Sequence, residues 1–175
     1  AQWTATGSGC VVLSSGGDGP VIDCITTGKI MDKGITDANN MGAAMAPAAA
    51  DTFIRHFQDT GRDPAYYDLI VTGDLGKIGK SIVIDMLSES GYDMTKNYND
   101  CGLMLFDCDT QDVHSGGSGC ACSALTFCGY LYQLLHSKKL NRILFTATGA
   151  LMSTTMVQQG ESIPGIAHAV SILNV

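Results

Sequence analysis

The sequence contains no run of about 18 or more apolar residues, so it predicts no membrane-spanning helix. It is also poor in basic residues, with 10 Lys and Arg against 17 Asp and Glu. The net charge of −7 argues against a nucleic-acid partner, because phosphate binding requires a basic surface. Charged residues make up only 15% of the chain, which indicates that its faces are largely covered.

The sequence also has no Cys-x-x-Cys pair and no Asn-x-Ser/Thr glycosylation site, although it contains 7 cysteines. Cys120 and Cys122 stand at the start of an expected helix, where their side chains point in different directions. We therefore expect reduced, buried cysteines, no metal site and no cofactor. A chain that begins at Ala1 without a signal pattern is expected to start within a longer protein or to have lost a segment, and not to be secreted through a signal peptide.

The apolar content is 45%, and 21 glycines provide for many tight turns. A chain of 175 residues is about the size of one domain, so we expect a single α/β domain over residues 1–175. Two β-rich runs, residues 5–14 and 20–31, flank a glycine-rich turn and predict an antiparallel hairpin. Asp37 is expected to cap a helix over residues 38–60, in which Pro47 predicts a kink or a restart.

The rest of the chain alternates between expected strands and helices. Such alternation predicts an open, mixed sheet that is covered on both faces. We expect loops at residues 92–100 and 150–165. The expected strands are 67–72, 103–106, 142–148 and 166–172, and the expected helices lie directly after residue 76 and over 119–136.

Three turns are expected at the carboxyl ends of these strands, where ligands bind in open α/β sheets. They are residues 73–76, residues 114–119 and the loop after Gly149. His114 and four small residues precede a helix that is apolar on nearly every side, and backbone N–H groups at a helix N-terminus suit carboxylate or carbonyl oxygens. The candidate ligand-binding residues are His114, Ser115, Gly116, Gly117, Ser118, Asp74 and Gly149.

Each candidate also has a purely structural alternative. His114 is suited to act as a general acid or base or as an oxyanion donor, but the glycines beside it also permit close helix packing. Asp74 either caps a helix or orients His114 or a polar ligand. His114 and Asp74 are the catalytic candidates if the protein is an enzyme, although no nucleophile is evident. His168 is expected to face the core, and His56 is expected to be incidental.

Five segments resemble the stage V sporulation protein AD family of spore-forming Firmicutes, and the match runs nearly end to end over what corresponds to the C-terminal half of that protein. The segments are residues 3–9 (WTATGSG), 73–76 (GDLG), 112–120 (DVHSGGSGC), 148–152 (TGALM) and 158–168 (QQGESIPGIAH).

The resemblance implies a thiolase-like fold related to the ketoacyl synthase III enzymes, in which two α/β halves face each other through buried helices. This chain would be one three-layer α/β/α half with a five-stranded mixed sheet. The histidine segment of those synthases corresponds to residues 72–76, with Asp74 near the histidine, and their asparagine segment to residues 114–116. The usual catalytic pair is then not retained, which leaves condensing activity in doubt.

The resemblance further implies a binding protein for dipicolinic acid or its calcium chelate that serves its uptake into the developing spore. The implied partners are membrane proteins of the same sporulation operon and the chain's own N-terminal half. Separately, the apolar face of the expected helix over residues 119–136 predicts association with a second copy in a homodimer. The implied location is the forespore, peripheral to the spore inner membrane. An acyltransferase or condensing enzyme and a structural scaffold of a membrane transport complex are the alternatives.

Overall fold

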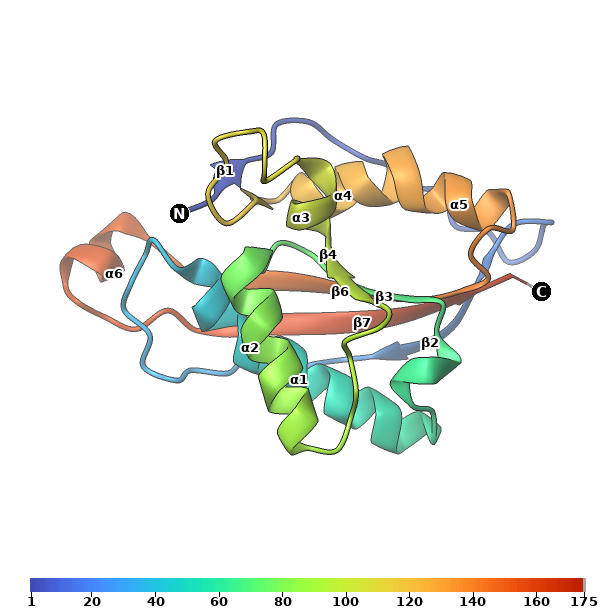
Figure 1. The fold of residues 1–175 in the computed structure, drawn as a ribbon, viewed down its shortest axis with the longest axis horizontal. Helices are drawn as coiled ribbons and strands as arrows, with labels where there is room; N and C mark the ends of the chain where they lie inside the picture. Colours follow the sequence, from blue (N-terminus) through green and yellow to red (C-terminus); the bar gives the residue numbers. More distant parts are fainter. Residues whose placement is uncertain (175) are drawn as a thin grey trace.

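In a computed structural model, which describes residues 1–174, a mixed α/β fold is observed (Figure 1). Its elements follow the chain in this order: β1 (Trp3–Thr4), β2 (Val21–Thr26), α1 (Met41–Thr60), the short 3₁₀ helix η1 (Pro64–Tyr66), β3 (Leu69–Thr72), α2 (Gly76–Glu89), β4 (Tyr98–Asp100), α3 (Cys101–Leu105), β5 (Gly117–Ser118), α4 (Cys122–Thr126), the π-helical turn η2 (Phe127–Leu131), α5 (Tyr132–His136), β6 (Arg142–Ala150), α6 (Thr154–Gln158) and β7 (Gly165–Leu173).

The main sheet has five strands in the order β2-β7-β6-β3-β4, which confirms the expected mixed sheet. Strand β3 runs parallel to β4 and β6, whereas β7 runs antiparallel to β6 and β2. A separate two-stranded parallel pair joins β1 to β5. Because β3, β4 and β6 are parallel, their carboxyl ends lie at the same edge of the sheet.

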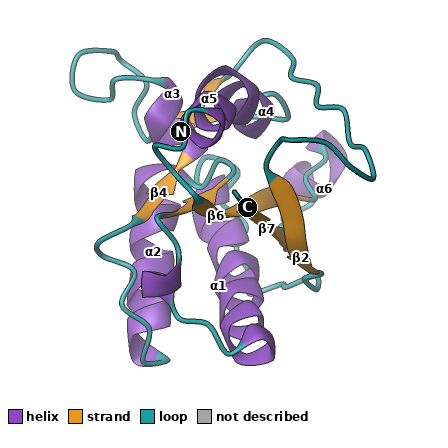
Figure 2. Cartoon of the chain, turned by 90° about the vertical axis from the view of Figure 1, so that its right-hand side faces the viewer, coloured by secondary structure: helices purple, strands orange, loops and turns teal. Residues whose placement is uncertain are grey.

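Helices cover both faces of the sheet (Figures 1 and 2). Alternate strand residues point to opposite faces. Ile70 and Leu144 therefore pack with Phe53 in the core beneath α1 and α2. Val71 and Ile143 pack into the second core, beneath α3, α4 and α5. The structure thus has the three layers that the strand and helix pattern predicts.

Helix α1 is rich in alanine and runs through Pro47 as one element. Its N-cap is Asn40, whose side chain accepts a hydrogen bond from the backbone N–H of Ala43 at 3.4 Å, and it ends at Gly61 in a left-handed conformation. The expected cap at Asp37 is wrong. The Asp37 carboxylate instead accepts from the Asn39 amide at 2.9 Å in the preceding turn.

The expected hairpin over residues 5–31 is also wrong. Strand β1 pairs with β5 and strand β2 pairs with β7, so the two runs never meet as a ladder. An isolated two-stranded hairpin is marginal in water. The nine-residue β7 offers β2 a longer apolar partner that is already part of the sheet.

Four smaller expectations are corrected as well. Where a strand over residues 103–106 was expected, residues 101–105 form helix α3. The Asp100 carboxylate accepts a hydrogen bond from the Gly102 amide at 3.0 Å and caps the helix there. The expected loop at 92–100 contains β4, and the one at 150–165 contains α6. His168 is exposed, because β7 turns its small residues, among them Ala167 and Ala169, toward α1.

The expected helix over residues 119–136 is confirmed as a composite of α4, η2 and α5. Leu131 and Leu135 are buried against the sheet, whereas Tyr130 is 53% and Tyr132 42% exposed. The helix therefore buries one side in this chain and not all of its surface.

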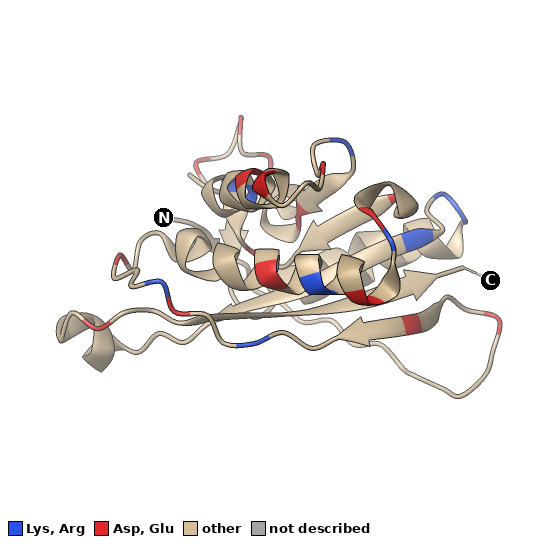
Figure 3. Ribbon diagram, turned by 90° about the horizontal axis from the view of Figure 1, so that it is seen from below, with Lys and Arg blue, Asp and Glu red and all other residues tan. Residues whose placement is uncertain are grey.

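None of the helices described over residues 1–174 combines the length and the apolar character that crossing a membrane requires. The outer surface of α1 carries acidic and basic residues in alternation (Figure 3). Arg55, the one Lys or Arg of this helix, forms an ion pair with Asp51 at 2.9 Å, and Lys29 reaches the same carboxylate.

Candidate functional site

Asp100, at the end of β4, organises the sheet edge where the expected ligand site lies. Its fully buried carboxylate accepts hydrogen bonds from the hydroxyl of Thr72 at 2.7 Å and from the Leu75 amide at 2.8 Å. The other oxygen accepts from the amides of Gly76 and Gly102, both at 3.0 Å. Burial raises the pKa of this carboxyl, while the hydrogen bonds oppose the rise. One side chain thus fixes the starts of both α2 and α3.

Asp74 joins the three turns that the sequence places at this edge. One carboxylate oxygen accepts from the Gly119 amide at 2.9 Å, and the other from the Thr148 hydroxyl at 2.9 Å. The residue is only 8% exposed, and burial raises the pKa of its carboxyl. Asp74 therefore connects the end of β3, the start of α4 and the end of β6.

A cavity of about 430 Å³ opens beside Asp74, beyond the carboxyl ends of β3 and β6. Its wall combines hydroxyl groups, two methionines, one thiol and one carboxyl. The lining residues are Thr4, Met41, Met45, Asp74, Ser118, Gly119, Cys120, Ser123, Thr148, Gly149 and Ala150. The volume is in the usual range for small-molecule sites.

The structure brings some of the predicted site residues together and leaves others apart. Asp74, Ser118 and Gly149 line the cavity jointly, whereas His114, Ser115, Gly116 and Gly117 are not among its lining residues. Whether any of them binds a ligand stays a prediction.

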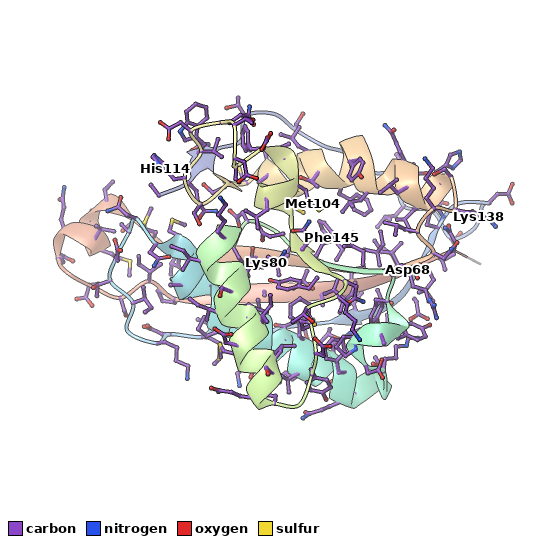
Figure 4. The ribbon with its side chains drawn as sticks, in the orientation of Figure 1. Asp68, Lys80, Met104, His114, Lys138 and Phe145 are labelled. Carbon is purple, nitrogen blue, oxygen red and sulfur yellow. The ribbon has the colours of Figure 1, made fainter. Side chains whose placement is uncertain are left out.

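His114 lies in the loop that precedes α4, at the outer end of the molecule (Figure 4). It has a left-handed backbone (φ 53°), and its side chain is 56% exposed. Its Nδ1 lies 3.6 Å from a carboxylate oxygen of Asp112. Gln2 forms a bridge with His114 and donates from its side chain to the Asp74 carbonyl at 3.0 Å. His114 is thus connected to Asp74 through Gln2.

Several amides of the glycine run already have protein acceptors. The Gly116 amide donates to the Val113 carbonyl at 2.9 Å, and the Gly119 amide donates to Asp74. The Ser115 amide donates to the Ala1 carbonyl at 3.1 Å. These N–H groups hold the loop in place, so a ligand would need other donors.

The glycines also permit close packing, which was the structural alternative. A Cβ at Gly117 would lie 2.9 Å from the ring of Phe106, and one at Gly102 would lie 2.2 Å from the Gly117 carbonyl oxygen. The backbone of the 114–119 loop and that of α3 are therefore in direct contact.

Sequence reasoning missed three polar residues. Asp100 follows polar residues that predict a loop, although an Asp directly before an apolar run is a helix-start signal. Thr148 is expected only as part of a strand. His56, expected to be incidental, is fully buried and contacts the Tyr67 hydroxyl through Nε2 at 2.5 Å and the Thr26 hydroxyl through Nδ1 at 2.8 Å. Its position on the apolar side of α1 was the available signal.

Within residues 1–174, no three His, Cys, Asp or Glu side chains lie close enough together to hold a metal ion. The cavity wall therefore offers hydroxyl donors, apolar surface and a single buried carboxyl. These groups suit the binding of a small polar molecule with an apolar body.

The fold and the site define an α/β protein with a ligand-sized cavity at the carboxyl ends of parallel strands. The family model described as Stage V sporulation protein AD (SpoVAD) matches residues 1–173. A curated relative, the stage V sporulation protein AD of Bacillus subtilis (strain 168), is 52% identical over 170 residues, which cover 97% of this chain. The chain therefore belongs to the stage V sporulation protein AD family and is a sporulation protein. It spans 50% of the length of that relative.

Proposed function

We propose that this chain is a non-catalytic binding unit for dipicolinic acid, or its calcium chelate, and serves its uptake into the developing spore. The observation that carries the proposal is the 430 Å³ cavity beside Asp74. It lies where open α/β sheets bind their ligands, and it has room for a flat aromatic acid.

The wall of the cavity matches the two chemical parts of dipicolinate. Met41 and Met45 offer polarizable apolar surface to the ring. The hydroxyls of Thr4, Ser118 and Ser123 are donors for carboxylate oxygens. This division of apolar surface and donors favours a planar acid over a fully apolar ligand.

The charge of the site favours a neutralised form of the ligand. Among residues 1–174, Asp74 is the only carboxyl on the wall, and the 175-residue chain carries a net charge of −7. A free dianion would be repelled, whereas the calcium chelate brings its own positive charge.

The arrangement supports binding more than chemistry. Among residues 1–174, none that lines the cavity is a histidine, and both carboxylate oxygens of Asp74 already accept hydrogen bonds. These two bonds hold the Asp74 carboxylate to the backbone and to Thr148, whereas a general base must be directed at the proton that it removes.

Within the whole protein, we propose that this chain is one half of a thiolase-like molecule. The exposed Tyr130 and Tyr132 on the upper helices would then face the N-terminal half or a second copy of the chain. Partners in the membrane and a location at the forespore inner membrane belong to the same proposal. They are supported by the sporulation family to which the chain belongs.

Calorimetric titration of the full-length protein with dipicolinate, with and without calcium, tests the proposal. The Gly149→Val variant adds a side chain to a residue of the cavity wall, at a position where a Cβ meets only Ile166, at 3.6 Å. We expect binding to weaken at least about tenfold, which corresponds to about 1.4 kcal/mol. The matched control is Gly16→Val, a position where a Cβ meets nothing within 4 Å. Equal affinity of Gly149→Val and wild type would refute the cavity as the site.

His114→Ala tests the imidazole in the same titration. If His114 contacts the ligand at the outer end of the site, its removal should also weaken binding at least about tenfold. The exposed side chain contributes little to folding, so the melting temperature should change by no more than a few degrees. Unchanged affinity would remove His114 from the site.

A further inference from the structure

The chain segment after β1 crosses the upper helix at very close range. A Cβ at Gly9 would lie 2.6 Å from the backbone oxygen of Ala124 and 2.8 Å from the sulfur of Cys128. A Cβ at Gly7 would lie 2.7 Å from the side chain of Leu125. The two glycines thus bring the backbone onto the helix and fix the point at which it crosses.

This crossing places two cysteines side by side. The Cys128 sulfur lies 3.8 Å from the carbonyl oxygen of Cys10. Since that oxygen is two bonds from its own Cα, the sulfur is within about 6 Å of the Cys10 Cα. Cys10 is exposed and Cys128 is partly exposed, so small reagents can reach both.

The positions of both residues are fixed by independent contacts. Upstream, the Ala5 amide donates to the Ser118 carbonyl at 2.8 Å, which continues the β1–β5 pairing. Cys128 lies in the π-helical turn η2, one turn after Ala124, where the segment crosses. Beyond Cys10, residues 11–20 belong to no helix or strand, so this part of the chain can adjust when a bond forms.

We propose that Cys10 and Cys128 are a redox modification site and form an intramolecular disulfide when a low-molecular-weight disulfide is present. The Cys10 thiolate attacks one sulfur of the reagent, and the other sulfur leaves as a thiolate. The Cys128 thiolate then attacks the Cys10 sulfur of the mixed disulfide and releases the second reagent thiolate. Two protein thiols are oxidised, one reagent disulfide is reduced, and the two protons end on the released thiols.

The Cys10–Cys128 disulfide would attach the weakly held residues around Cys10 to the helix that contains Cys128. Val12 is 92% and Leu13 73% exposed, so few contacts hold the residues that follow Cys10. Thr4, at the end of β1 directly before this segment, forms part of the cavity wall. The disulfide would therefore also anchor that wall to the helix whose N-terminus borders the cavity.

The experiment treats the reduced, purified full-length protein with oxidised glutathione and maps its disulfides by peptide mass spectrometry without reduction. We expect a Cys10–Cys128 cross-link and a loss of two free thiols. Proteolysis within residues 8–19 should slow at least about fivefold on oxidation and recover its rate on reduction, because cleavage follows local opening. A product with only glutathione adducts, or with Cys10 joined to another cysteine, would overturn the proposal.

Two variants and a control complete the test. Cys10→Ser and Cys128→Ser should each abolish both the cross-link and the proteolytic protection, and because Cys10 is exposed, Cys10→Ser leaves the fold intact. Cys108→Ser, which changes a partly exposed thiol elsewhere, should oxidise as the wild type does. Protection that persists in Cys10→Ser would also contradict the assignment.

Discussion

At the scale of single residues, two carboxylates hold the candidate site together. Asp100 fixes the starts of α2 and α3, and Asp74 connects the turns around the cavity. Both carboxyls are buried and have raised pKa values, yet each accepts hydrogen bonds on both oxygens. Their burial is tolerated because amide and hydroxyl donors replace the water that they lose.

Replacement of Asp100 by Asn tests this role. Four donors now form hydrogen bonds to the Asp100 carboxylate, two on each oxygen. The amide nitrogen of the introduced side chain cannot accept a hydrogen bond, so the donors on that side would be left buried without an acceptor. We expect Asp100→Asn to lower the free energy of unfolding by about 2–4 kcal/mol. Urea denaturation at neutral pH measures the change. Asp85→Asn, the same substitution at an exposed position on α2, should change it by less than about 0.5 kcal/mol.

The sequence predicted Asp74 but missed Asp100, for a physical reason. Asp74 follows an apolar strand and lies between Gly73 and Gly76, so a strand-to-helix turn is visible in the sequence. Asp100 ends a strand of only three residues, Tyr98–Asp100, which is too short to show a period. Its partners at Thr72, Leu75 and Gly76 are distant in sequence. Only the tertiary structure brings these donors together.

At the scale of elements, backbone contacts through glycine set the distance between α3 and the 114–119 loop. The Gly102→Ala variant should disturb this contact, because its Cβ would lie 2.2 Å from the Gly117 carbonyl oxygen. We expect a loss of about 1–3 kcal/mol in the free energy of unfolding, which thermal or urea denaturation will measure. The loop would move with α3, so ligand affinity should fall as well.

The Gly129→Ala variant is the matched control. Gly129 is also helical, but a Cβ there meets nothing within 4 Å. Both substitutions gain the same intrinsic helix propensity of Ala over Gly, about 1 kcal/mol. Gly129→Ala should therefore be neutral or stabilising. If the two variants behaved alike, the contact between Gly102 and the loop would not limit the packing of α3.

Long, regular elements were predictable from sequence, whereas pairings were not. The helix over residues 38–60 and the strand near 142–148 correspond to α1 and β6, because apolar period and flanking glycines are local signals. The hairpin over residues 5–31 failed since strand pairing depends on which partner the rest of the sheet offers. The turn at residues 15–19 exists, but it connects strands in different sheets.

At the scale of the whole molecule, a buried polar cluster connects α1, the edge strand β2 and the strand β7. His56 on α1 contacts Thr26 on β2 and the hydroxyl of Tyr67. Arg62, just beyond α1, donates to Asp23 on β2 at 2.6 Å and to the Ser171 hydroxyl on β7 at 3.3 Å. The edge strand is thus held by side chains as well as by its backbone ladder with β7.

This cluster predicts a loss of stability in mild acid. Burial, assisted by the positive charge of Arg62, lowers the pKa of His56 from 6.5 to about 4. The unfolded chain therefore binds a proton at His56 between these pH values while the folded chain does not. The contribution of His56 to stability is complete above about pH 6.5 and is lost as the pH falls toward about 4, by about 3 kcal/mol at most.

Urea denaturation of wild type and His56→Gln between about pH 7 and pH 4.5 separates this contribution from other titrating groups. The raised pKa values of Asp74 and Asp100 act in the opposite direction, because protonation relieves the cost of burying their charges. Those two carboxyls remain in both proteins. The difference between the two curves of unfolding free energy against pH therefore reports the contribution of His56. His136→Gln, at the exposed end of α5, should follow wild type. If wild type and His56→Gln lost stability in parallel, His56 would not govern the acid sensitivity of the edge strand.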